Sequence, residues 1–108
     1  MSLKLKDKVA IVTGAGTGIG RAIALLFAEE GAKVVCASLH ENSCKKTAED
    51  IVALGGKAIA VPTQVADRKD VEVLINNTIE KYGKIDVLVN NAGIVNCFCK
   101  VADVTEEQ

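Results

Sequence analysis

Several residue patterns on which common functions depend are absent from this sequence of 108 residues. No apolar run approaches the roughly 20 residues needed to cross a bilayer. The N-terminal apolar run over 9–12 is too short for a signal peptide. The 13 basic and 14 acidic residues nearly cancel, so no cationic excess indicates nucleic acid or anionic lipid as a partner. We therefore expect a cytoplasmic protein with no nucleic-acid and no membrane partner.

Cysteine and histidine are too sparse to predict a metal centre. His40 is the one histidine, and the four cysteines include no Cys-x-x-Cys pair. Without a secretory signal, disulfides are not expected. Cys36 is predicted to be a small buried residue at the end of a strand, and Cys97 and Cys99 are expected to line a loop.

Short Val/Ile-rich runs alternate with longer helical patterns along the whole chain. Strands are predicted over 8–13, 33–38, 57–65 and 85–93, the last including the turn after it, and helices over 18–31, 41–56 and 67–83. The strands recur about every 25 residues, which is the spacing of β–α units. This pattern predicts an α/β fold with a parallel sheet of about four strands and flanking helices.

Helix ends and inward faces can also be predicted from the pattern. Asp67 is the expected cap of the third helix, and Gly31 and Gly83 are expected helix stops. Apolar spacing assigns inward faces to the three helices in turn: Ile19, Ala22, Ile23, Leu26 and Phe27; Ala48, Ile51 and Leu54; Val71, Leu74, Ile75, Thr78 and Tyr82.

The last residues predict the start of another helix. Thr105 is followed three positions later by Gln108, which is the pattern of a capping box. A sheet that stops at its fourth strand has an open edge. We interpret residues 1–108 as one partial domain, the first part of a larger fold. The alternative is a natural short form that needs a partner.

Four glycines, at 14, 16, 18 and 20, follow the first predicted strand. Glycine lets the backbone approach a pyrophosphate, and the free N–H groups and dipole of the next helix favour the anion. A flexible turn with tight helix–strand packing would explain one or two glycines but not four. The run therefore predicts a phosphate-binding turn.

The spacing of these glycines discriminates among ligands. No lysine follows them, which excludes a Walker loop, and G-x-G-x-x-G counted from Gly14 fails at Ile19. An S-adenosylmethionine loop of a methyltransferase is the remote alternative. Such a loop usually has acidic residues where this chain has Val12, Thr13 and Ser38. The pattern that remains is T-G-x-x-x-G-x-G.

That pattern, TGAGTGIG over 13–20, resembles the nucleotide-binding motif of the short-chain dehydrogenases/reductases of the classical type. NNAG over 90–93 is similar to the second motif of that family. The resemblance implies a Rossmann-type doubly wound sheet that binds NAD or NADP and belongs to an oxidoreductase of alcohols or carbonyls. Asn90-Asn91 could otherwise be a polar turn at a strand end. The site residues implied by the two motifs are Gly14, Thr17, Gly18, Ile19, Gly20, Asn90, Asn91, Ala92 and Gly93.

Cofactor choice is expected to depend on the end of the second strand, at Ser38, Leu39 and His40. NAD-type members of the family have an acid in place of Ser38, which repels a 2′-phosphate. Ser38 therefore favours NADP over NAD. However, Thr17 and Leu39 occupy the places where NADP-type members usually have a basic residue. His40 is the nearest cationic candidate, with Lys45 and Lys46 further on.

A second departure from the family follows the third strand. Gln64-Val65 stands where the family often has Asp-Val next to the adenine. A glutamine carbonyl can still accept a hydrogen bond from the adenine amino group. We keep Gln64 and Val65 as candidate cofactor contacts.

No catalytic residue is predicted in this chain. The family uses a tyrosine with a lysine four positions later, but Tyr82 is followed at that distance by Asp86. The resemblance thus implies an oxidoreductase, expected to be a dimer or tetramer, of which this chain is the cofactor-binding half. The alternative is a non-catalytic module that binds a dinucleotide or pairs with related subunits.

Overall fold

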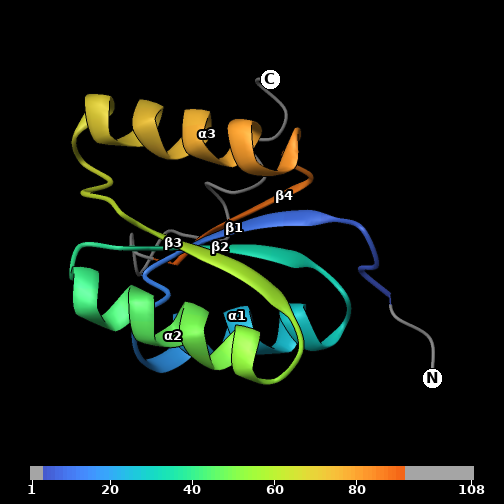
Figure 1. The fold of residues 1–108 in the computed structure, drawn as a ribbon. Coiled ribbons are helices and arrows are strands. Elements are labelled where there is room, and N and C mark those ends of the chain that lie inside the picture. The colour runs from blue at the N-terminus through green and yellow to red at the C-terminus, as the bar shows by residue number, and fades with distance from the viewer. Residues whose placement is uncertain (1–3, 92–108) are drawn as a thin grey trace.

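The structure is a computed structural model that describes residues 4–91, and it has three layers (Figure 1). Four parallel strands form one sheet in the order β3-β2-β1-β4. Helices α1 and α2 cover one face of the sheet and α3 covers the other (Figure 1). The parallel α/β fold predicted from the sequence is confirmed. The elements are β1 (Val9–Thr13), α1 (Gly18–Glu29), β2 (Lys33–Ser38), α2 (Glu41–Ala53), β3 (Lys57–Pro62), α3 (Arg68–Tyr82) and β4 (Val87–Asn90).

The two central strands are the most deeply buried part of the sheet. Every residue of β1 is buried, and β2 is buried from its second residue onward. Ile11 pairs with Val35 on one side and with Leu88 on the other. Continuous Val/Ile runs suit such strands because both of their faces are covered by helices.

The predicted caps are confirmed, whereas several strand limits differ from the prediction, β1 beginning at Val9 rather than at 8. The Asp67 side chain accepts hydrogen bonds from two backbone N–H groups of the first turn of α3, and Gly83 ends that helix at φ 84°. Strand β3 ends at Pro62 rather than at residue 65, and β4 begins at Val87 rather than at 85. Predictions for Ala92, Gly93, Cys97, Cys99 and 105–108 lie outside the described residues.

The predicted inward faces of the helices are partly wrong. On α1, Ile19 is 70% exposed and Leu26 is 53% exposed, whereas Gly20 and Ala24 are buried. Leu54, just after α2, is 81% exposed. Ala22 and Ile75 are exposed as well. Ile23 and Phe27 do pack against the core, as predicted. The buried small residues Gly20 and Ala24 let α1 lie close to the sheet between them.

The strand order puts the turn after β1 at the place where the chain reverses direction across the sheet. From β1 the chain moves to β2 and β3 on one side, and then returns to place β4 on the other side of β1. In open α/β sheets, ligands bind at this point, beyond the carboxyl ends of the strands. Within residues 4–91, no helix is both long and apolar enough to span a membrane.

Candidate functional site

The glycine turn between β1 and α1 uses its glycines in two different ways. Gly14 and Gly18 have positive φ values of 64° and 58°, which side-chain-bearing residues adopt only with strain. Gly20 instead permits close packing, because a Cβ there would lie 1.9 Å from the Gly14 carbonyl oxygen. Helix α1 therefore begins directly against the turn, as a phosphate-binding turn requires.

The amino end of α1 is left open by the described part of the chain. Thr17 is its N-cap residue, but the Thr17 side chain makes no capping hydrogen bond, and the first turn contains no acidic residue. A Cβ on Gly18 would have no described protein atom within 4 Å. The free N–H groups and the positive end of the helix dipole thus border open space, which is the arrangement that favours an anion.

A hollow of about 350 Å³ lies beside this turn, beyond the carboxyl ends of β1, β2 and β3. It brings together seven of the residues predicted from the sequence. Gly18, Ile19, Gly20, Asn90 and Asn91 are not among its lining residues. The lining consists of Gly14, Gly16, Thr17, Ser38, Leu39, His40, Ser43, Thr63, Gln64, Val65 and Ala66.

Ser38 is buried where β2 meets the hollow, and its backbone and side chain are both engaged. Its carbonyl accepts a hydrogen bond from the Thr63 N–H at 2.8 Å, and its hydroxyl oxygen accepts one from the His40 N–H at 3.2 Å. Leu39 between them is 63% exposed. The chain thus turns tightly around Ser38, and this turn presents Leu39 and His40 at the surface.

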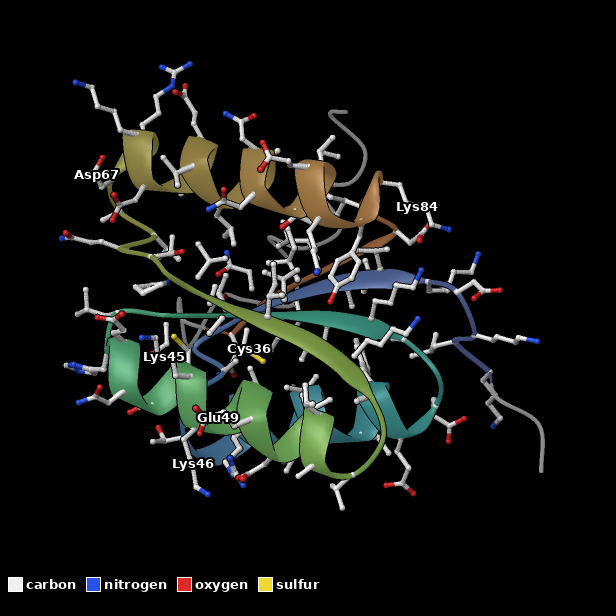
Figure 2. The ribbon with its side chains drawn as sticks, viewed as in Figure 1. Cys36, Lys45, Lys46, Glu49, Asp67 and Lys84 are labelled. Atoms are coloured by element: carbon white, nitrogen blue, oxygen red, sulfur yellow. The ribbon has the colours of Figure 1, made fainter. Side chains whose placement is uncertain are left out.

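Positive charge is scarce around the hollow. Among its described lining residues, only His40 can become cationic. The lysines further along α2 form ion pairs on their own helix, Lys45 with Glu41 at 3.0 Å and Lys46 with Asp50 at 2.9 Å. Figure 2 shows Lys46 on the outer side of α2, away from the sheet. The two lysines therefore do not line the hollow.

The loop after β3 forms the far wall of the hollow. The Gln64 N–H donates a hydrogen bond to an Asp70 carboxylate oxygen at 3.0 Å, which fixes the loop to the first turn of α3. The Gln64 side chain is exposed, and Val65 is 40% exposed. The backbone is thus held in place while both side chains face the surface beside the hollow.

Asn90 and Asn91 link the end of β4 to the end of β1. The Thr13 hydroxyl lies 3.2 Å from the Asn90 side-chain oxygen, and the Asn91 amide donates to the Gly14 carbonyl at 3.4 Å. That same amide nitrogen would lie 2.7 Å from a Cβ on Gly20. Both side chains therefore brace the glycine turn from the β4 side.

Tyr82 lies at the opposite end of the sheet from the glycine turn. It ends α3, and the Lys33 ammonium lies 5.8 Å from the centre of its ring. Burial is the main cause that raises the pKa of Tyr82 above its ordinary value. A tyrosine in this position packs against the sheet and is too far from the turn to act on a cofactor there.

The described cysteines are structural. Cys36 and Cys44 are fully buried, and Figure 2 shows Cys36 between the sheet and α2. Burial raises the pKa of Cys36 to about 12 and also raises that of Cys44, so both thiols stay protonated at neutral pH. Among residues 4–91, no cluster of His, Cys, Asp or Glu could hold a metal ion.

Three lining residues were not predicted from the sequence: Ser43, Thr63 and Ala66. Gly16, also in the lining, was predicted as part of the glycine run, without a role of its own. Ser43 lies in the first turn of α2, three positions after His40. Because the helix that follows the second strand begins beside the glycine turn, residues of its first turn can be predicted to lie near a ligand there. Thr63 and Ala66 had no local pattern that distinguishes them from ordinary loop residues.

Comparisons with known proteins agree with this geometry. The family model described as short chain dehydrogenase matches residues 8–108. An uncharacterized oxidoreductase of Thermotoga maritima is 42% identical over 105 residues, covering 97% of this chain and 41% of that protein. The 7alpha-hydroxysteroid dehydrogenase of Escherichia coli is 41% identical over 92 residues, covering 85% of this chain and 36% of that protein.

A solved structure has the same fold. The crystal structure of hydroxysteroid dehydrogenase from Escherichia coli matches with a TM-score of 0.80 and 40% identity, covering 82% of this chain and 37% of that chain. This chain thus spans well under half the length of the proteins that it resembles.

Proposed function

Because the chain belongs to the short chain dehydrogenase family, we propose that the whole protein is an NAD(P)-dependent oxidoreductase acting on an alcohol or carbonyl substrate. Members of the family use NAD or NADP. The observation that supports the proposal most directly is the glycine turn, with its open helix end beside the hollow at the carboxyl edge of the sheet. In this proposal the 108 residues provide the cofactor-binding half, and the complete protein is a dimer or tetramer.

The described residues fit the adenosine-diphosphate part of such a cofactor. Open space at Gly18 and the uncapped N–H groups from Gly18 to Gly20 suit a pyrophosphate, with Gly14 and Thr17 beside it. The hollow would then take the adenosine, with Ser38, Leu39 and His40 near its ribose and Gln64 and Val65 near the adenine. When bound, the cofactor supplies the hydride chemistry.

We further propose that the preferred cofactor is NADP. A carboxylate at the end of β2 would repel a 2′-phosphate, whereas Ser38 is small and uncharged. The hydroxyl oxygen of Ser38 already accepts the His40 N–H, which orients the His40 backbone beside the ribose position. His40 would add positive charge whenever it is protonated.

Direct titration with NADPH and NADH tests both proposals. We expect the full-length protein to bind NADPH more tightly, and Ser38→Asp to weaken NADPH at least tenfold by charge repulsion, on the order of 1–2 kcal/mol. Ser38→Ala, which removes the hydroxyl without adding charge, is the matched control. Equal NADPH affinity in Ser38→Asp and Ser38→Ala would show that residue 38 is not at the ribose.

A non-catalytic dinucleotide-binding module is the second candidate. It would use the same glycine turn and hollow to bind a dinucleotide without chemistry. NADPH oxidation with a panel of ketones and aldehydes separates the two candidates. Binding without turnover on any member of the panel would favour the module, and binding of S-adenosylmethionine in place of NADPH would contradict both.

A further inference from the structure

Thr47, in the middle of α2, makes a contact that its own burial does not require. Its side chain is fully buried, and its hydroxyl donates to the carbonyl oxygen of Ala15, in the glycine turn, at 2.9 Å. The same hydroxyl also lies 3.2 Å from the Ser43 carbonyl of its own helix. The shorter contact is the one that reaches out of the helix, 32 positions back along the chain.

Thr78 on α3 shows how a buried threonine in a helix can satisfy its hydroxyl group within that helix. It is also fully buried, and its hydroxyl donates to the Leu74 carbonyl of its own helix at 2.8 Å. Such a bond within the helix is the ordinary way to satisfy a buried threonine hydroxyl. Thr47 has this option with Ser43, so its contact with Ala15 is an additional link between α2 and the turn.

The link to Ala15 fixes one peptide group of the glycine turn. The Ala15 N–H donates to the Ala37 carbonyl of β2 at 3.0 Å, so Ala15 is held on both sides. In a planar trans peptide the carbonyl of one residue and the N–H of the next point in opposite directions. Holding the Ala15 carbonyl toward Thr47 therefore aims the N–H of Gly16, which lines the hollow, away from α2.

The Arg21–Asp50 ion pair contacts the Thr47 hydroxyl. Arg21 on α1 donates to the Thr47 hydroxyl oxygen at 3.2 Å and to an Asp50 carboxylate oxygen at 2.5 Å. Hydrogen bonds from Lys46 and Arg21 lower the pKa of Asp50, so its carboxylate is charged at neutral pH. The Thr47 hydroxyl thus accepts a hydrogen bond from Arg21 and donates its single proton toward Ala15.

We propose that Thr47 is a positioning residue for cofactor binding, which orients the Ala15–Gly16 peptide of the glycine turn through its hydroxyl. The inference rests on the proposed function, because it concerns the affinity of that same site. Thr47 does not line the hollow, so it acts on a ligand only through its neighbours. Ala15 in the turn is the nearer partner of its hydroxyl, and Ser43, which lines the hollow, is the other.

Three variants of the full-length protein, titrated with NADPH, test the assignment. Thr47→Val keeps the shape and removes the hydroxyl, and we expect it to raise the Kd for NADPH about tenfold, the effect of losing one buried hydrogen bond. Thr47→Ser restores the hydroxyl and is expected to restore the wild-type Kd to within about threefold. Thr78→Val removes an equally buried hydroxyl on α3 and is expected to leave the Kd unchanged while lowering the melting temperature.

The possible results separate this inference from the proposed function. Wild-type Kd in folded Thr47→Val, or equal weakening in Thr47→Val and Thr47→Ser, would overturn the role of the hydroxyl while leaving dinucleotide binding intact. Absence of NADPH and NADH binding by the wild-type protein would overturn both. If Thr47→Val does not fold, Arg21→Met is measured instead: a weakened NADPH affinity is expected, and an unchanged one would overturn the assignment.

Discussion

A hollow at the amino end of the sheet, of about 580 Å³, is larger than the hollow of about 350 Å³ at the carboxyl end. Glycines border both hollows, and they serve different purposes at the two ends. At the carboxyl end, Gly20 lets a helix touch the turn, and Gly18 leaves space at a helix amino end. At the amino end, Gly31 and Gly55 have φ values of 98° and 95° and follow the ends of helices.

Helix direction, rather than volume, distinguishes the two hollows. The larger hollow is bordered by the carboxyl ends of α1 and α2, where helix dipoles disfavour an anion. The smaller hollow is bordered by the amino ends of the same two helices. A phosphate-bearing ligand is therefore expected at the smaller one, and changes at the two ends should have separable effects on ligand affinity and on stability.

Gly20→Ala should have the largest effect, because the new Cβ meets backbone rather than side chain. It would lie 1.9 Å from the Gly14 oxygen and 2.6 Å from the Gly14 carbonyl carbon. We expect a loss of about 3 kcal/mol in the free energy of unfolding, at the upper end for overpacking, together with loss of NADPH binding. Urea denaturation measures the first effect, and a wild-type midpoint would contradict the close packing of α1 on the turn.

Gly18→Val should separate ligand affinity from folding. The positive φ costs about 1–2 kcal/mol for a residue with a Cβ, but no described protein atom obstructs the side chain. The folded variant should lose NADPH binding, because the valine would occupy the proposed pyrophosphate position. Gly83→Val is the control. Gly83 also has a positive φ and open space around it, but it lies at the carboxyl end of α3 and not in the glycine turn. If both variants bind NADPH like the wild type, the turn is not the pyrophosphate site.

The contacts of Asp86, at the amino end of the sheet, predict that the stability of the fold depends on pH. Its carboxylate accepts the Val9 N–H at 2.8 Å and pairs with Lys84 at 3.1 Å, and these contacts lower its pKa, the Val9 bond most. The stabilisation is therefore present above the ordinary carboxyl pKa and is lost as pH falls through the lower value of the folded state. Asp86→Asn should make the loss of stability at low pH (the acid limb) shallower in urea melts, although Asp50, whose pKa is also lowered, keeps part of it. The Kd for NADPH at pH 7 should be unchanged. An acid limb as steep as that of the wild type would contradict the assignment.

Gly56→Ala should have the smallest effect. The added Cβ would approach the Ile51 Cγ2 methyl group at 2.8 Å and the Ile51 carbonyl oxygen at 3.3 Å, so the buried Ile51 side chain must shift. We expect a destabilisation of about 1 kcal/mol, at the lower end for overpacking, and no change in NADPH affinity. A weakened affinity in this variant would mean that the amino-end hollow communicates with the ligand.

The alternation of strands and helices could be predicted from sequence because local chemistry decides it. Buried Val/Ile runs form β1 and β2, and Asp67 and Gly83 bound α3 through a cap and a left-handed residue. The glycine spacing likewise placed the candidate turn directly after β1. Each of these features depends on residues that are near neighbours in the chain.

What could not be predicted depends on tertiary packing. Gly20 and Ala24 are the buried residues of α1, with Ile23 and Phe27 packed beside them, so apolar spacing identified Ile23 and Phe27 correctly but also assigned the exposed Ile19 and Leu26 to this face. The contact of Thr47 with Ala15 joins residues 32 positions apart, and no pattern in the sequence around Thr47 indicates a link to the turn. Such residues become visible only once the turn and α2 are placed side by side.

The hydrogen bond from Asn91 to Gly14 has a consequence for how the protein is made. The two residues are 77 positions apart, and β4 is the last described strand to be synthesised, although it lies beside the first. At a synthesis rate of roughly 5–20 residues per second, Asn91 is made about 4–15 s after Gly14. During that interval β1, β2 and β3 can already pair in the order of their synthesis. The turn that the cofactor would need is therefore completed only once β4 is made, so a nascent chain arrested before β4 should hold three strands and bind no dinucleotide.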